Sequence, residues 1–139
     1  MQAITPYLNF NGNGAEALAF YTTALNGKIV HSQTFGESGM PVDDAQKDKI
    51  MHALFEADKL SFMISDVRPT DELISGNQIS LSLNFDTVAL INETFANLSQ
   101  GGKITMELQD TSWGARFGMV TDKFGINWMF NFDYPKEEK

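Results

Sequence analysis

Residues 4–29, ITPYLNFNGNGAEALAFYTTALNGKI, return in altered form at residues 79–104 as ISLSLNFDTVALINETFANLSQGGKI. The two stretches align without a gap and share eight identical positions over twenty-six. The spacing of seventy-five residues is too long for a solenoid, whose repeats run ~20–50 residues. We therefore expect one domain of two similar halves, with a concave surface between them. The identities are Ile4, Leu8, Asn9, Phe10, Phe20, Gly27, Lys28 and Ile29, matched by Ile79, Leu83, Asn84, Phe85, Phe95, Gly102, Lys103 and Ile104.

The first half is expected to run strand, helix and three strands. Residues 5–10 predict a strand that ends at the turn-forming residues 11–14. An apolar stripe at helical spacing then predicts a helix, ended by Asn26-Gly27 in the manner of a left-handed cap. The stripe consists of Ala17, Phe20, Tyr21, Ala24 and Leu25. The remaining strands are expected over about 28–35, 49–57 and 59–66, with a polar loop at 36–48 and a hairpin about Asp58.

The second half is expected to repeat this order after a linker at about 67–77. Asp86 or Thr87 is the expected helix N-cap. The helix carries Val88, Ile91, Phe95 and Leu98 on one side, and strands are expected over about 78–85, 103–109, 113–121 and 126–132, before a charged tail at 134–139. The predicted fold class is α+β: two βαβββ modules, at about 3–66 and 78–133, form a cupped mixed sheet with helices outside, as a single domain over 1–139.

The two faces of the predicted strands differ in character. One face is apolar and is expected to meet the helices. The opposite face is polar but uncharged, with methionine and tyrosine among hydroxyl and amide groups, which is typical of a sheltered, partly wet ligand cavity. A small barrel interior with satisfied polar side chains is the alternative. This opposite face carries Thr5, Tyr7, Asn9, Ser61, Met63, Ser65, Ser80, Ser82, Asn84, Asn127, Met129 and Asn131.

The composition excludes several classes of partner. The net charge of −8 disfavours nucleic acids and anionic membranes, because a binder of either needs a basic face. No apolar run approaches the ~20 residues of a membrane span, and the N-terminal residues lack the features of a secretory signal. Cysteine is absent, so disulfides and thiolate chemistry are excluded. These features favour a cytoplasmic location.

Several motifs resemble those of the vicinal oxygen chelate superfamily, which includes glyoxalase I, extradiol dioxygenases, fosfomycin-resistance enzymes and bleomycin-binding proteins. The match is closest to its PhnB-like branch, some of whose members are labelled 3-demethylubiquinone-9 3-methyltransferase. No glycine-rich strand-to-helix loop for S-adenosylmethionine is present here. The motifs are Tyr7-Leu8-Asn9-Phe10, Ala15-Glu16-Ala17, Phe20-Tyr21, Met63-Ile64-Ser65-Asp66, Gly101-Gly102 and, most specific, WGARFGMVTDKFGINWM at 113–129.

The resemblance also places the superfamily's metal ligands. Enzymes of the superfamily hold a divalent metal with His, Gln or Glu on the first, fourth, fifth and eighth strands. In this chain the final-strand glutamate falls on Met129 and its first-half counterpart on Met63. The other two positions fall near 5–7 and at Gln78 or Ser80. Thioethers and hydroxyls do not replace carboxylate or imidazole for a hard or borderline cation, so we expect no metal and no other cofactor.

Two further groups carry alternatives. His31 and His52 lie on neighbouring predicted strands and, with Glu56 or Glu107, would make a metal or acid–base cluster. The alternative is an exposed histidine beside a hydrogen-bonded one. Trp113 and Arg116 are expected in one strand, on opposite sides. Arg116 needs a partner in its apolar setting, either Asp110 or Asp122 as a structural pair or an anionic ligand.

The resulting hypothesis is a small-molecule-binding protein that holds its ligand in the cup without a catalytic metal. The resemblance further implies a homodimer. The alternatives are a metal-dependent lyase or dioxygenase with unusual ligands and a structural dimer with a vestigial cavity. Neither the ligand nor any reaction follows from the sequence. The candidate ligand-binding residues are Tyr7, Asn9, His52, Met63, Ser65, Ser82, Trp113, Arg116, Met129 and Asn131.

Overall fold

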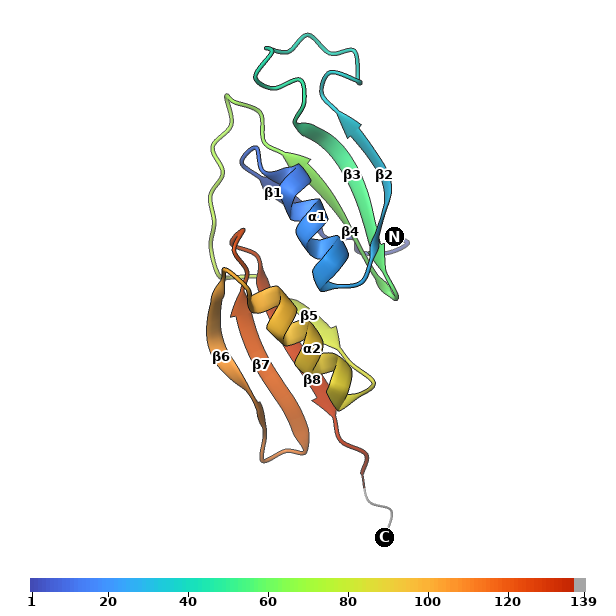
Figure 1. Cartoon of the computed structure of the whole chain (residues 1–139), viewed down its shortest axis with the longest axis vertical. Coiled ribbons are helices and arrows are strands. Elements are labelled where there is room, and N and C mark those ends of the chain that lie inside the picture. Colours follow the sequence, from blue (N-terminus) through green and yellow to red (C-terminus); the bar gives the residue numbers. More distant parts are fainter. Residues whose placement is uncertain (137–139) are drawn as a thin grey trace. The chain divides into compact units, whose positions relative to one another are not determined.

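Strands of alternating polarity and one amphipathic helix build the same unit twice (Figure 1). The computed structural model describes residues 1–136. The first unit contains β1 (Tyr7–Phe10), α1 (Gly14–Ala24), β2 (Lys28–Thr34), β3 (Ile50–Ala57) and β4 (Leu60–Asp66). The second contains β5 (Leu81–Asn84), α2 (Val88–Ser99), β6 (Lys103–Asp110), β7 (Ala115–Thr121) and β8 (Asn127–Asp133). The predicted α+β class with two βαβββ modules is confirmed.

Each unit forms its own four-stranded mixed sheet. The strand orders are β1-β4-β3-β2 and β5-β8-β7-β6. In both, the first strand pairs in parallel with the last, and the other pairings are antiparallel. The register repeats as well, because Leu8 lies opposite Ile64 and the equivalent Leu83 lies opposite Phe130. The compact units are Met1–Ile74 and the chain from Ser75 onward. Their union in a single domain stays a prediction.

The core of the first unit lies between α1 and one face of its sheet. Tyr21 of α1 is fully buried and contacts Phe62 edge-on, with ring centroids 5.5 Å apart. Phe55 and Phe62 stack at 4.7 Å. The helix buries Leu18, which the predicted stripe omits, whereas Phe20 is only half-buried. The apolar face therefore has the predicted position, with the stripe of α1 rotated toward Leu18.

The second unit repeats this packing with fewer rings. Phe95 of α2 contacts Phe130 of β8 edge-on at 5.0 Å, and Phe85 stacks on the same ring at 6.1 Å. Trp128 and Leu98 are fully buried beside them. Among residues 1–136, neither helix has the length and apolar character that a membrane crossing requires.

Two glycines at equivalent positions of the repeat allow the second strand of each unit to lie close to the third. A Cβ on Gly27 would collide with Phe55 and come within 2.7 Å of the Glu56 carbonyl oxygen. A Cβ on Gly102 would collide with the Thr121 carbonyl oxygen. Any side chain at either position would therefore push the second strand off the third. The left-handed residue before Gly27 is Asn26, with φ 52°, as expected of a cap.

The helices begin on different caps. Thr87 accepts a hydrogen bond from the Leu90 backbone N–H at 3.1 Å, as predicted for α2. The α1 N-terminus is instead capped by a residue distant in the sequence. Asp66, only 2% exposed, accepts from the backbone N–H groups of Gly12 (3.1 Å) and Gly14 (2.8 Å) through Oδ1. Its Oδ2 accepts from Ile50 N–H at 2.8 Å, so one carboxylate joins β4, α1 and β3.

Several predicted boundaries are wrong, and β1 begins at Tyr7 rather than at residue 5. β5 begins at Leu81 rather than at residue 78, and Ile79 is 77% exposed. β7 begins at Ala115, because Gly114 takes a positive φ of 85° that ends the turn before it. The predicted tail is partly ordered: the Tyr134 N–H donates to the Gly114 carbonyl oxygen at 3.0 Å, and residues 137–139 lie outside the described residues.

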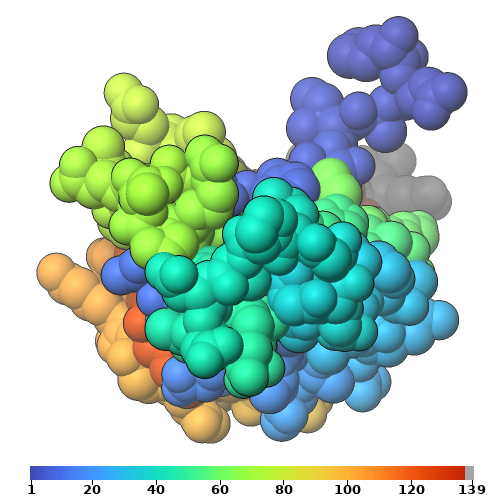
Figure 2. All heavy atoms as spheres, turned by 90° about the horizontal axis from the view of Figure 1, so that it is seen from above, coloured from blue at the N-terminus to red at the C-terminus, as the bar shows by residue number. Residues whose placement is uncertain are grey.

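The polar loop at 36–48 folds back on its own base. Gly36 N–H donates to the Lys47 carbonyl oxygen at 2.9 Å, and Phe35 N–H donates to the Lys49 carbonyl oxygen at 3.0 Å. Gln46 is buried and donates to the Val67 carbonyl oxygen at 3.4 Å. Figure 2 shows this segment, in teal, at the front of the view from above.

Replacing Asp66 by asparagine is expected to destabilise the protein by about 1–3 kcal/mol, because an NH2 group would then face at least one buried N–H donor. Asp71→Asn is the matched control. Asp71 is an exposed residue that pairs with Arg68 at 3.0 Å, and such surface pairs contribute about 0–1 kcal/mol. Urea unfolding followed by circular dichroism measures both variants. Equal losses of stability would contradict the role given to Asp66.

Candidate functional site

In the first unit, the sheet face opposite α1 carries the predicted polar residues. Ala53, Phe55, Phe62 and Ile64 point toward α1 and are buried. The alternate positions therefore lie on the other face, where Tyr7 is opposite Met63 and Asn9 is opposite Ser65. His52 lies on the same face through its contact with Tyr7. Five of the ten predicted site residues thus share one surface, called here the helix-free face: Tyr7, Asn9, His52, Met63 and Ser65.

A phenol–imidazole pair is the main polar feature of this face. Tyr7 Oη and His52 Nδ1 lie 3.2 Å apart, and the histidine tautomer decides which atom donates. The His31 ring follows, with its centroid 6.1 Å from that of His52. The predicted neighbourhood of the two histidines is confirmed. The three side chains offer donors and acceptors on an open surface, a chemistry suited to orienting a polar ligand group.

The helix-free face of the second unit carries three more predicted residues. Ser82 lies opposite Met129, and Asn131 lies opposite both Asn84 and Phe117. Asn131 donates to Asn84 Oδ1 at 3.2 Å. These side chains alternate with Trp128, Phe130 and Phe132, which are buried on the side of α2.

One residue of the predicted polar face has a structural role. Asn127 donates to the carbonyl oxygens of Gly76 (2.9 Å) and Ile79 (3.1 Å), and its Oδ1 accepts from Thr121 at 2.9 Å. This amide therefore fastens the segment before β5 to β8. For this residue, the alternative of a satisfied polar side chain is correct.

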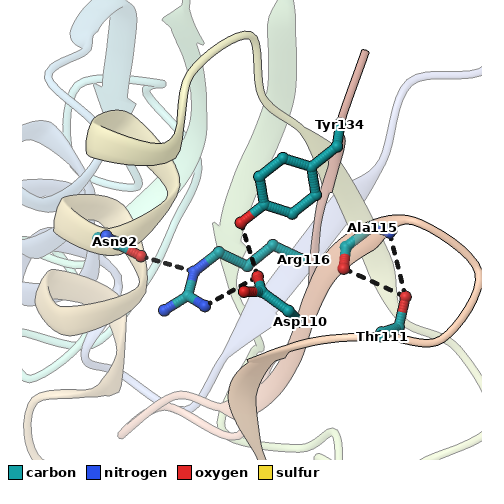
Figure 3. A network of polar contacts seen from close by, with 6 residues as sticks. All are labelled: Asn92, Asp110, Thr111, Ala115, Arg116 and Tyr134. Carbon is teal, nitrogen blue, oxygen red and sulfur yellow. Dashed lines mark hydrogen bonds and ion pairs between the residues drawn. The ribbon is translucent and has the colours of Figure 1, made fainter. Parts of the chain in front are cut away.

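Arg116 lies on the helix side of its sheet, away from the predicted lining (Figure 3). Its Nε donates to Asn92 Oδ1 of α2 at 2.9 Å, and its Nη1 donates to Asp110 Oδ1 at 3.2 Å. Tyr134 Oη donates to the same Asp110 oxygen at 2.6 Å. Of the partners considered for Arg116, Asp110 is the one found, and this structural pair supplies its counter-charge.

Asp122, the other partner considered for Arg116, is hydrogen-bonded to other groups. It is buried, and its carboxylate accepts from Trp128 Nε1 at 2.9 Å and from the backbone N–H of Phe124 at 2.9 Å. Sequence reasoning missed Asn92 and Tyr134 as members of the Arg116 network. For Tyr134, the sequence did contain a signal. It follows Phe132 by two residues, and residues at that spacing in a strand lie on the same face.

Trp113 lies in the turn between β6 and β7 and is 72% exposed. The prediction that it shares a strand with Arg116 is wrong. Thr111 closes this turn, because its Oγ1 accepts from the Ala115 N–H at 3.1 Å and its own N–H donates to the Ala115 carbonyl oxygen at 2.7 Å. The indole is therefore carried on a tight turn and is exposed.

A depression of about 360 Å³ lies at the end of the β3–β4 hairpin, and none of the predicted site residues lines it. Its polar walls belong to Asn26, Gly27, Lys28, Glu56, Ala57 and Asp58.

The donor set does not fit the divalent metal of the superfamily's enzymes. Met63 and Met129, at two of the ligand positions, offer only thioethers, and residues 5–7 at the third offer only hydroxyls. At the fourth position, which is Gln78 or Ser80, the amide of Gln78 is the single ligand type that the family uses, and one neutral amide does not make a metal site. Within residues 1–136, no three His, Asp or Glu side chains gather closely enough to hold a metal ion. We therefore derive no metal-assisted step for this chain.

The Arg116 network predicts how Tyr134 titrates. The hydrogen bond to Asp110 raises the pKa of Tyr134 above its usual 10.0, and the same bond lowers the pKa of Asp110. Their contributions to stability are therefore lost as pH rises through the Tyr134 pKa or falls through the Asp110 pKa. Asp110→Asn should lower the Tyr134 pKa toward 10.0, measured by tyrosinate absorbance against a Tyr134→Phe reference. An unchanged midpoint would contradict the network.

Comparison with known proteins agrees with this architecture. The family model described as the glyoxalase/bleomycin resistance protein/dioxygenase superfamily matches residues 4–130. Protein YjdN of Escherichia coli is 33% identical over 138 residues, covering 92% of this chain and 93% of that protein. The crystal structure of PA1353 from Pseudomonas aeruginosa superposes with a TM-score of 0.87 at 40% identity, covering 97% of this chain and 100% of that one.

A second solved structure supports the PhnB-like resemblance. The Bacillus cereus PhnB protein, described as a putative 3-demethylubiquinone-9 3-methyltransferase, superposes with a TM-score of 0.80 at 28% identity. The alignment covers 94% of this chain and 99% of that one. Together with the doubled βαβββ fold and the match over nearly the whole chain, these likenesses show that the protein belongs to the glyoxalase/bleomycin resistance protein/dioxygenase superfamily.

Proposed function

We propose that this protein binds a small molecule on its helix-free sheet faces and does so without a catalytic metal. The observation that carries the proposal is the composition of these faces. Where β1 pairs with β4 and β5 pairs with β8, neutral hydroxyl, amide and thioether groups occupy positions at which a solvated sheet would carry charged side chains, whereas the charged pair Lys28 and Glu56 lies farther across the first face. Such a mixture suits a ligand that is partly apolar and is oriented by a few hydrogen bonds.

Each predicted residue on these faces has a role in the proposal. Tyr7 and His52 hold a polar group of the ligand, because their hydrogen-bonded pair keeps both side chains oriented. Met63 and Met129 supply adaptable apolar contact. Arg116 and Trp113 are left out, since one is bonded on the helix side and the other projects from a turn. The remaining hydrogen-bonding groups are Asn9, Ser65, Ser82 and Asn131.

The family supplies the first probe. Its description includes bleomycin resistance proteins, so bleomycin is a reasonable ligand to test beside a fragment library. Chelator-treated protein is expected to show at least one compound that raises its thermal stability, since a ligand at 100 times its Kd contributes about 2.7 kcal/mol. Tyr7→Phe should weaken that stabilisation because the ligand loses an oriented hydroxyl.

The control for this test is Tyr134→Phe, which removes a hydroxyl of the same kind outside the proposed site. Stabilisation that depends on added nickel, zinc, manganese or iron would favour the metal-dependent alternative. No stabilisation by bleomycin or by any fragment, with or without metal, would favour a vestigial surface and overturn the proposal.

The proposal includes self-association into a homodimer. Ile4 and Ile79 are equivalent positions of the repeat, identical in both halves, and are 88% and 77% exposed. Large apolar side chains kept at matched positions suggest cover by a second copy of the chain, the commonest assembly of soluble proteins. Ile79→Ser should then weaken a dimer in sedimentation velocity, whereas Ile74→Ser, at an equally exposed position outside the repeat, should not. A monomeric parent protein would refute self-association.

A further inference from the structure

Three methionines lie directly opposite one another on adjacent strands of the second unit. Met129 of β8 is the register partner of Met119 of β7, and Met119 is the partner of Met106 of β6. Ser82 of β5 lies opposite Met129 and completes a row across the whole sheet. Opposed residues on neighbouring strands have Cβ atoms about 4.5–5.5 Å apart and point to the same side.

The side on which this row lies follows from the neighbouring residues. Val120 and Trp128 are opposite one another and buried against α2. Met119 and Met129, one position away on each strand, therefore point to the helix-free face. Met106 points there with its partner and is 41% exposed. The three thioethers, called here the methionine row, are thus accessible on one surface.

A β-bulge brings the third methionine into place. At the turn, Asp110 lies opposite Arg116, and a regular ladder from this pair would place Glu107 opposite Met119. A register shift between Met106 and Gln109 adds one residue to β6, so Met106 takes that position instead, and a second shift follows between Ile104 and Met106. The residue opposite Met119 therefore offers the thioether of Met106 and not the carboxylate of Glu107.

The equivalent row of the first unit has a different chemistry. Its members, at the same sheet positions, are Tyr7, Met63, Leu54 and His31. It contains a single thioether. The two rows share their geometry, so they provide an internal comparison of three thioethers with one.

Thioether sulfur is a soft, neutral donor that selects Cu(I) over hard or borderline cations. The methionine side chain has three rotatable bonds, so three of them on neighbouring strands can turn their sulfur atoms toward one point above the central residue, Met119. The chain's net charge of −8 favours approach of a cation. We propose that Met106, Met119 and Met129 form a binding site for a soft monovalent cation, Cu(I).

This site shares Met129 with the proposed small-molecule surface but does not rest on that function, and it differs from the superfamily's divalent centre in its donors. The family's divalent cations need carboxylate or imidazole ligands, and only Met129 of the row stands at a family ligand position. The row adds two methionines from β6 and β7. A protein that fails to bind bleomycin or any fragment can therefore still bind Cu(I), and the reverse also holds.

The test uses the whole protein with methyl-13C-labelled methionine, of which the chain has seven residues. The first titration uses Ag(I), a redox-inert soft cation. The second titration uses Cu(I), under anaerobic conditions and against the chelator bicinchoninate. We expect the methyl signals of Met106, Met119 and Met129 to shift together at one cation per chain. Met119→Leu, which keeps an apolar side chain but removes the central sulfur, should weaken Cu(I) binding by at least about tenfold.

Met63→Leu is the matched control, because it removes the single thioether of the equivalent row and should leave Cu(I) affinity unchanged. A His31→Ala, His52→Ala double variant removes the imidazoles that also bind soft ions, and the methionine shifts should persist in it. The proposal is overturned if the three signals do not move, if Met63 moves equally, or if Met119→Leu binds Cu(I) as tightly as the parent. Unchanged circular dichroism of the variants ensures that loss of binding is not loss of fold.

Discussion

Each four-stranded sheet is covered by one helix, on one face, and the rest of the structure depends on this constraint. A helix can bury only one face of a sheet, so every strand must alternate between a residue for the core and a residue for the other side. The core side is aromatic, with Tyr21 against Phe62 in the first unit and Phe95 against Phe130 in the second. Among residues 1–136, no helix or strand of the same unit covers the other side. On this side, the positions of β1, β4 and β5 that match in the repeat carry no Lys, Arg, Asp or Glu.

The two units stabilise the same architecture with different side-chain hydrogen bonds. In the first, Asp66 joins the start of α1 to β3 and β4 through three backbone N–H groups. Ser65 and Asn131 occupy equivalent positions, because each lies opposite the equivalent residue of the first strand in its unit. The next residue along each strand is therefore also equivalent, so Asp66 corresponds to the buried Phe132 of the second unit. There, Thr87 caps α2 locally, and the buried carboxylate is Asp122, which is bonded to Trp128 across the β7–β8 turn. The fold therefore constrains where backbone groups need partners, while each half satisfies them with its own residues.

The sequence predicted the fold well because the repeat and the strand alternation are local and redundant. Gly27 and Gly102 recur where the chain has no room for a Cβ, and Asn26 takes the positive φ expected of it. The polar faces of β1, β4, β5 and β8 also followed from alternation alone. Arg116 did not, because the side of a strand on which it lies depends on the register of its hairpin. Its position in line with Gly118 and Val120 places it toward α2, and its partner Asn92 is twenty-four residues away.

The bulge in β6 shows why the site could be predicted only in part. Counting outward from the Asp110–Arg116 pair gives Glu107 opposite Met119, and this count would have suggested a carboxylate beside a thioether. The structure inserts one residue and presents Met106. A bulge arises from the packing of neighbouring strands and leaves no reliable mark in composition or periodicity. Gly118 lies next to it, and a Cβ there would come within 3.0 Å of the Leu108 Cα and 2.8 Å of a Phe95 ring carbon, so the close approach of β6 to β7 requires glycine. The same close packing that fixes the bulge thus decides which side chain faces Met119, and the chemistry of the second unit's open face follows from it.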